Sequence, residues 1–194
     1  MKALTIIGIV LGVFLLIGLF VASIFVGNYN KLVSSSATVD NSWAEVDTQY
    51  QRRFDLVPNL VASVKGAQGQ ELAVFTAIAD ARKQYQSATS VEGKVAAVNS
   101  YESNIALLPR LQEAYPELKS NATLNRFMDE LTGTENRILI ARNRYNAEVK
   151  TYNVIVKSFP TMFFAGLYGY GERTYFKSAE AAATAPTVDL TPAK

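Results

Sequence analysis

The 194-residue sequence contains no cysteine and no histidine. Without cysteine there are no disulfides, no zinc–thiolate sites and no thiol nucleophile. Without histidine the chain lacks the commonest general base and the commonest ligand for transition metals. A di-iron helical bundle is also excluded, because it needs Glu-x-x-His pairs. We therefore expect a non-enzymatic protein with no metal and no cofactor; the alternative is a membrane-associated enzyme that depends on its scattered carboxylates.

An excess of charge of one sign is also missing. The chain has 19 basic and 17 acidic residues and a net charge of +2. Proteins that bind nucleic acid usually show a basic stripe, so no nucleic-acid partner is expected. The sequence also has no glycine-rich phosphate loop and no dinucleotide-binding fingerprint.

A long apolar run is present at the N-terminus. Residues 4–26 carry no charge, and as a helix of about 23 residues they would extend roughly 34 Å, enough to cross a bilayer core of about 30 Å. The competing interpretation is a cleaved signal peptide, whose apolar region would be shorter and would precede a cleavage site of small residues. We predict a retained transmembrane anchor over residues 1–27.

The remaining sequence has the periodicity of helices and no convincing alternation of strands. Apolar residues recur every three or four positions over about 28–65, 71–87, 91–115 and 124–159. The predicted class is all-α: the transmembrane helix continues into an elongated antiparallel four-helix bundle over residues 28–158, with a seam as in coiled coils. Gly66 and Gly69 mark the first turn, Thr89 and Glu92 form a predicted capping box, and Pro109 should kink the third helix.

Two polar features of the first bundle helix have structural interpretations. Pro58 has no N–H and should leave the carbonyl of Phe54 without its helical partner, a group that Asn59 could help to satisfy. Arg52, Arg53 and Asp55 could form an anion or partner site. We favour instead a set of ion pairs with carboxylates of the fourth helix, for which the candidates are Asp129, Glu130 and Glu135.

An aromatic and glycine-rich segment follows the fourth helix, over residues 159–177. Its uncharged part is too short to span a membrane, and aromatic rings favour the headgroup region. The helix lengths should return this segment to the membrane surface. Lipid contact is therefore preferred over a cap on the bundle, and residues 178–194 are predicted to be a disordered tail. The predicted membrane-contact residues are Phe163, Phe164, Leu167, Tyr168 and Tyr170.

Self-association is predicted from two features. Gly8 and Gly12 have the small-xxx-small spacing that permits close helix contact in a bilayer, although glycine is also simply common in such helices. The second and third helices are too short to cover the membrane-proximal parts of the first and fourth. Val33, Val149 and Tyr152 would then lie in an exposed apolar seam, which predicts a homo-oligomer.

Several motifs follow the anchor in a fixed order, and together they resemble the bacterial LemA family over about residues 29–176. The resemblance implies a single-pass membrane protein with a helical-bundle domain, and it supplies no activity. Pro109 departs from the family pattern. The motifs are Tyr29-Asn30-Lys31-Leu32-Val33, Trp43 with Glu45-Val46-Asp47, Arg52-Arg53-Phe54-Asp55-Leu56-Val57-Pro58-Asn59-Leu60-Val61, Tyr115-Pro116-Glu117-Leu118-Lys119-Ser120-Asn121, Thr134-Glu135-Asn136-Arg137-Ile138, Ala141-Arg142 with Tyr145-Asn146, Tyr152-Asn153 and Phe159-Pro160.

These observations predict a self-assembling scaffold or membrane-organising protein in the bacterial inner membrane. Its partners would be membrane lipid and further copies of the chain, and the sequence names no other protein partner. Lys2 precedes the anchor and only Lys31 lies close behind it, a bias that slightly favours the N-terminus inside and the bundle outside.

Overall fold

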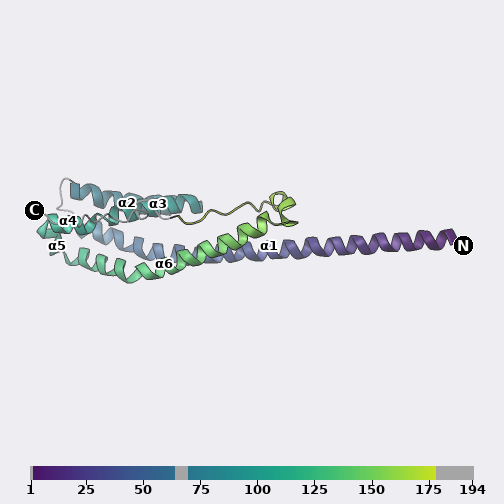
Figure 1. The fold of residues 1–194 in the computed structure, drawn as a ribbon. Helices are drawn as coiled ribbons and strands as arrows, with labels where there is room; N and C mark the ends of the chain where they lie inside the picture. Colours follow the sequence, from purple (N-terminus) through teal and green to yellow (C-terminus); the bar gives the residue numbers. More distant parts are fainter. Residues whose placement is uncertain (1, 64–69, 178–194) are drawn as a thin grey trace, which may run out of the picture. The chain divides into compact units, whose positions relative to one another are not determined.

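The computed structural model describes residues 2–63 and 70–177, and within these residues every regular element is a helix. The predicted all-α fold is thus confirmed. The turn predicted at Gly66 and Gly69 and the tail predicted over 178–194 lie outside the described residues. The elements are α1 (Lys2–Ser63), α2 (Gln70–Ser87), α3 (Val91–Ile105), α4 (Leu108–Ala114), α5 (Pro116–Lys119), α6 (Ala122–Lys157) and the 3-10 turns η1 (Thr161–Phe163) and η2 (Gly166–Tyr168) (Figure 1).

The chain divides into two compact units. The first, here the anchor unit, comprises Met1–Ala44 and Arg144–Arg173, and the second, here the bundle unit, comprises Glu45–Asn143 and Thr174–Lys194. Helices α1 and α6 each contribute one part to both units. The two units are described one at a time below.

Helix α1 runs unbroken through 62 residues, past both Gly27 and Pro58. Within the bundle unit, the carbonyl that Pro58 deprives of a helical partner is nevertheless satisfied. Arg82 Nε of α2 donates a hydrogen bond of 3.0 Å to the backbone oxygen of Phe54. The sequence suggests Asn59 as the partner of this carbonyl. In the structure the partner is instead Arg82, a side chain from a different helix.

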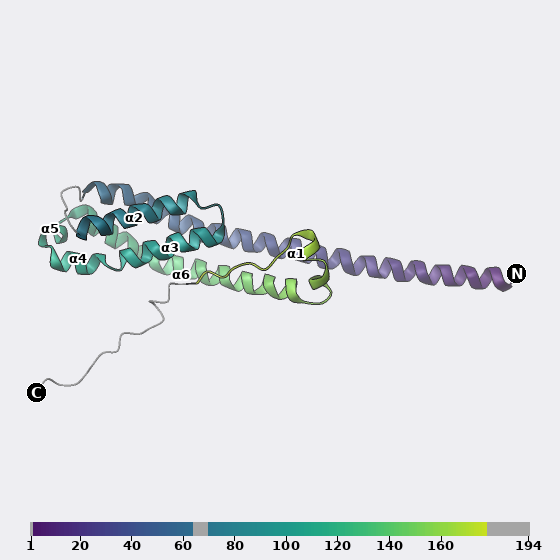
Figure 2. The ribbon, with the colours of Figure 1, turned by 90° about the horizontal axis from the view of Figure 1, so that it is seen from above.

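Helices α2 and α3 form an antiparallel hairpin in the bundle unit, and Figures 1 and 2 both show them side by side. Helix α3 is capped by Ser90, whose Oγ accepts a hydrogen bond of 3.1 Å from the backbone N–H of Gly93. The predicted cap at Thr89 is therefore wrong by one residue. A serine oxygen at this position satisfies an N–H that the first turn of a helix leaves unpaired.

The expected kink at Pro109 is replaced by a helix boundary. Helix α3 ends at Ile105 and α4 begins at Leu108, so Pro109 lies in the first turn of α4. Proline is well accommodated there, because the N–H that it lacks would have had no intrahelical partner. Asn121 then caps α6: its Oδ1 accepts hydrogen bonds of 3.0 Å from the N–H groups of Thr123 and Leu124.

Aromatic rings dominate the core of the bundle unit. The Phe54 ring lies 4.7 Å from the rings of both Tyr85 and Tyr101, and the Tyr50 ring stacks on Phe176 with centroids 6.1 Å apart. All five side chains are buried. Because Phe176 follows α6 in sequence, the core of this unit includes a residue from the extended segment beyond the last helix.

The anchor unit buries two of the three residues that were expected to form an exposed seam. Val149 and Tyr152 of α6 are essentially inaccessible, and only Val33 of α1 keeps a partly exposed side chain, at 37%. The prediction that Val149 and Tyr152 are free to join chains is wrong. The segment that returns after α6 approaches Tyr152, with the Arg173 guanidinium 5.9 Å from the centre of its ring.

Candidate membrane-contact site

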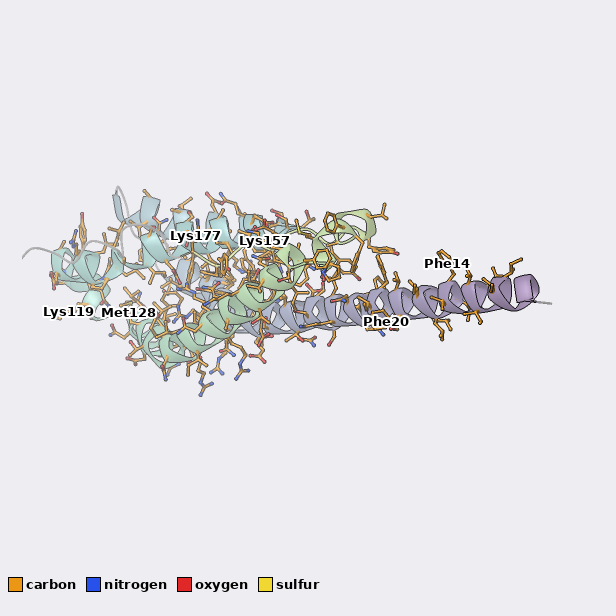
Figure 3. The ribbon with its side chains drawn as sticks, turned by 45° about the vertical axis from the view of Figure 1, so that its right-hand side comes forward. Phe14, Phe20, Lys119, Met128, Lys157 and Lys177 are labelled. Atoms are coloured by element: carbon orange, nitrogen blue, oxygen red, sulfur yellow. The ribbon has the colours of Figure 1, made fainter. Side chains whose placement is uncertain are left out.

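The N-terminal half of α1 meets the requirements for crossing a membrane by length and composition, and no residue of its most apolar stretch is buried. Figure 3 shows Phe14 and Phe20 pointing away from the helix with no other element beside them. Both rings are about two-thirds exposed. Exposure of so many large apolar side chains is costly in water, and it is the arrangement expected of a helix surrounded by lipid.

The segment after α6 folds into two tight turns beside α1 in the anchor unit. Gly169 ends η2 with a φ of 78°, in the left-handed region that favours glycine. This reversal lets the N–H of Tyr170 donate a hydrogen bond of 2.9 Å to the carbonyl of Ala165. Gly169 thus permits the tight reversal that ends the second turn.

One side of these turns packs on α1. The Phe164 ring lies 5.1 Å from that of Phe25, and the Tyr168 ring lies 5.2 Å from that of Tyr29. Phe164 is only 5% exposed. The structure therefore corrects the expected lipid contact of Phe164: its ring fastens the segment to α1.

The other side of the turns is apolar and exposed. Phe159, Phe163 and Leu167 are 79%, 72% and 81% exposed, and Met162 and Tyr168 are more than half exposed. Of the predicted contact residues, Phe163, Leu167 and Tyr168 are thus presented to the surroundings, whereas Tyr170 is half-buried. We call Phe159, Met162, Phe163 and Leu167 the exposed apolar face.

A groove of about 310 Å³ lies between α1 and the turns. Its lining consists of Phe25, Val26, Tyr29, Phe164 and Tyr168. Phe25 and Val26 are the last two residues of the charge-free run. The groove therefore lies at the level where the predicted anchor leaves the hydrocarbon.

Polar contacts hold the end of this segment within the anchor unit. The buried Asn153 side chain donates a hydrogen bond of 2.9 Å to the carbonyl of Arg173 and accepts one of 2.8 Å from its N–H. The Arg173 guanidinium lies 3.2 Å from Asp40, and Lys157 lies 2.8 Å from Glu172. The sequence alone predicts no role for Asn153. The one feature that singles this residue out is its place in the Tyr152-Asn153 motif.

The predicted ion-pair residues lie in the bundle unit. Arg52 of α1 lies 2.6 Å from Glu130 of α6, and the buried Arg53 lies 2.8 Å from Glu135. Asp55 is exposed and has no ion-pair partner among the described residues.

Arg53 Nε also donates a hydrogen bond of 2.7 Å to the hydroxyl of Thr134, and its Nη2 donates one of 2.9 Å to the carbonyl of Leu131. The set fastens α1 to α6.

A second buried polar cluster in this unit was not found from sequence. Tyr50 donates a hydrogen bond of 2.7 Å to Glu102 Oε1, and the Arg142 guanidinium contacts both residues. Burial raises the pKa of Glu102 to about 7, an effect increased by Glu135 and opposed by Arg53. Burial also lowers the pKa of Arg142 to about 10. A carboxylate with a pKa near neutrality can exchange protons. The carboxylate of Glu102 is instead engaged by Tyr50 and Arg142.

No group of three or more acidic side chains suited to a metal ion occurs among the described residues. Comparison with known proteins gives the affiliation of the chain: the family model of LemA matches residues 42–190. The chain belongs to the LemA family. Together with the apolar N-terminal helix, this makes it a membrane-associated LemA protein.

Curated LemA relatives of this chain include three magnetosome proteins. Magnetosome protein MamQ 2 and magnetosome protein MamQ 1 of Paramagnetospirillum magneticum AMB-1 are each 25% identical to it over 191 residues, covering 85% of this chain and 70% of theirs. Magnetosome protein MamQ of Magnetospirillum gryphiswaldense MSR-1 is 25% identical over 182 residues, covering 80% of this chain and 67% of its own.

Proposed function

We propose that this protein is a non-enzymatic, self-assembling scaffold that organises the bacterial inner membrane and contacts lipid at two places. The anchor crosses the bilayer, and the exposed apolar face of the turns lies against the bilayer surface. The observation that carries this proposal is the ring contact between Phe25 and Phe164, with centroids 5.1 Å apart. It ties the turns to the end of the charge-free run, where rings favour the interface between hydrocarbon and headgroups.

The buried charges of the bundle unit support a structural rather than a catalytic role. Arg53 is held by Glu135, Thr134 and a backbone carbonyl, and Glu102 by Tyr50 and Arg142. A catalytic carboxylate would need access to a substrate. The alternative of a carboxylate-dependent enzyme would be favoured if purified protein turned over a substrate and Glu102→Gln abolished that activity.

Self-assembly is proposed through the anchors. Gly8 and Gly12 lie on one face of α1, and apart from the nearby backbone of α1 itself no atom of the described residues lies within 4 Å of the position where a Cβ would stand on either. Two anchors could therefore pack closely at this face. Val33 remains a candidate further along α1, whereas Val149 and Tyr152 no longer are.

Quenching by brominated lipid tests the membrane-contact role, because the chain has a single tryptophan, Trp43. The test variant combines Phe163→Trp with Trp43→Phe in the full-length protein, reconstituted in phosphatidylcholine vesicles whose acyl chains are brominated near the headgroup. Strong quenching is expected. The unaltered protein is the matched control, because Trp43 lies about 26 Å along α1 from Val26 and should stay unquenched.

Equal and weak quenching of both proteins would overturn the membrane-contact role of the turns. Thermal unfolding of the two proteins, followed by circular dichroism, shows whether the substitution preserves the fold. Phe163 is 72% exposed, so replacement by tryptophan should change the melting temperature little.

A further inference from the structure

The groove between α1 and the turns is bounded by rings that meet at steep angles. Phe25 and Phe164 are tilted by 41°, Tyr29 and Tyr168 meet at 63°, and Phe164 and Tyr168 meet at 73°. None of these three pairs stacks flat. The Tyr29–Tyr168 and Phe164–Tyr168 pairs meet edge to face, and a space of about 310 Å³ lies among these side chains.

We propose that this groove holds part of one acyl chain of a phospholipid drawn from the surrounding bilayer. The proposal rests on the membrane-contact role proposed above. Phe25 and Val26 close the charge-free run, so lipid tails already surround the anchor at this depth. Small-molecule sites occupy about 300–1,000 Å³, so a groove at the lower end of that range admits a segment of one chain rather than a whole lipid.

The lining of the groove selects for hydrocarbon. Three of the five lining residues, Phe25, Val26 and Phe164, offer no hydrogen-bonding side chain, and Tyr29 and Tyr168 offer only a hydroxyl each. Water would find few partners there, and apolar cavities usually stay dry. A peptide segment at this depth would need partners for its N–H and C=O groups, which this lining does not supply. An acyl chain has no such requirement.

The two tyrosines suit the mouth of such a site. Tyrosine carries an apolar ring and a polar tip, and it is enriched where a membrane changes from hydrocarbon to headgroups. Tyr29 lies one helical turn beyond Phe25, away from the anchor, and Tyr168 lies one turn of chain beyond Phe164. Each wall of the groove thus pairs a phenylalanine with a tyrosine in the same order.

Lipid retention by the full-length protein tests the proposal. The protein is reconstituted in dioleoylphosphatidylcholine, extracted into a mild detergent and weighed by native mass spectrometry. One retained phospholipid per chain is expected. Val26→Phe should fill the groove and reduce retention at least tenfold, and Tyr168→Ala should remove a wall and have the same effect. Val21→Phe is the matched control, because Val21 is an exposed anchor residue outside the groove.

The outcomes separate the two proposals. Equal retention by Val26→Phe and Val21→Phe, or no retention by the unaltered protein, would overturn the lipid site. Quenching of Trp at position 163 should persist when Val26→Phe is added, because the exposed apolar face does not include Val26. Absence of quenching in the Phe163→Trp variant that keeps Val26 would overturn the membrane-contact role itself. Retention of free oleate in place of the phospholipid would overturn the assignment to bilayer lipid.

Discussion

Arg82 of α2 completes the hydrogen bonding of Phe54 of α1. Its Nε lies 3.0 Å from the Phe54 carbonyl oxygen, four residues before Pro58. A proline inside a helix removes one backbone hydrogen bond, and here a side chain from a neighbouring helix supplies the missing donor. The irregularity in α1 thereby becomes a specific link between α1 and α2.

Replacing Arg82 tests this link. Arg82→Ala should lower the free energy of unfolding by about 1–3 kcal/mol, since a part-buried carbonyl loses its donor. The same change in a Pro58→Ala background should cost less, because residue 58 then regains an N–H for that carbonyl. Thermal unfolding of the four full-length proteins in detergent gives the coupling, expected to exceed about 0.5 kcal/mol. Additive effects would show that the contribution of Arg82 does not depend on Pro58, which would contradict this link.

Phe176 is expected to stabilise the bundle unit far more than its neighbour Tyr175. The Phe176 ring is 4% exposed, stacks on Tyr50 and lies 4.4 Å from the Arg142 guanidinium, whereas Tyr175 is 38% exposed. Phe176→Ala should therefore cost about 3–5 kcal/mol, as for other buried phenylalanines. Tyr175→Ala should cost under about 1 kcal/mol. Similar melting temperatures for the two variants would contradict this assignment.

Stability should fall as the pH rises through neutrality because of Glu102. Burial raises the pKa of this group from 4.5 to about 7. Between these values the folded chain retains a proton that the unfolded chain has released, so raising the pH favours unfolding, by up to about 3 kcal/mol in total. The contribution is complete below about pH 4.5 and is lost as the pH rises through about 7.

Glu102→Gln should flatten this pH dependence between pH 5 and 8, as measured by urea unfolding at a series of pH values. Glu113→Gln, which removes an exposed carboxylate on α4, serves as the control and should leave the profile unchanged. A profile of the unaltered protein that is flat across this range would show that Arg142 keeps Glu102 ionised.

The anchor face that carries Gly8 and Gly12 should govern self-association. Gly12→Leu places a bulky side chain where two helices would approach, and it should shift the detergent-solubilised particle toward the monomer mass in light scattering. Gly18→Leu adds the same side chain on a different face and should leave the mass unchanged. A particle that is monomeric without any substitution would rule out self-association in that detergent.

Cysteine labelling tests the orientation. The chain has no cysteine, so Thr89→Cys, in the exposed loop between α2 and α3, introduces a unique thiol. With the bundle outside, a membrane-impermeant maleimide should label it in intact spheroplasts. Labelling that requires lysis would place the bundle in the cytoplasm.

Sequence periodicity predicted the helices well because it reports a local property. The apolar spacing alone placed α2 and α6 within a few residues of their observed ends. It could not show which helix carries the donor for Phe54, because Arg82 is 28 residues away in sequence. Pro109 was interpreted as a kink, although proline suits the start of a helix equally well.

The candidate site was only partly predictable for a similar reason. Composition predicted that residues 159–177 contact the membrane, but it could not separate Phe163 from its neighbour Phe164. One ring is exposed and the other is packed on Phe25. Phe163 ends η1 and Phe164 caps it, and such a short 3-10 turn has no apolar period in the sequence that would separate the two rings. The exposure of Tyr152 was predicted wrongly because Arg173, in the segment that returns after α6, lies against its ring.

The stacking of Phe176 on Tyr50 also has a consequence for synthesis on the ribosome. About 126 residues separate the two rings, and at roughly 5–20 residues per second the second is made some 6–25 s after the first. The anchor emerges before either and can enter the bilayer while the core of the bundle unit still lacks its closing ring. A nascent chain that stalls in this interval would be membrane-bound with an open core, a natural substrate for quality-control proteases.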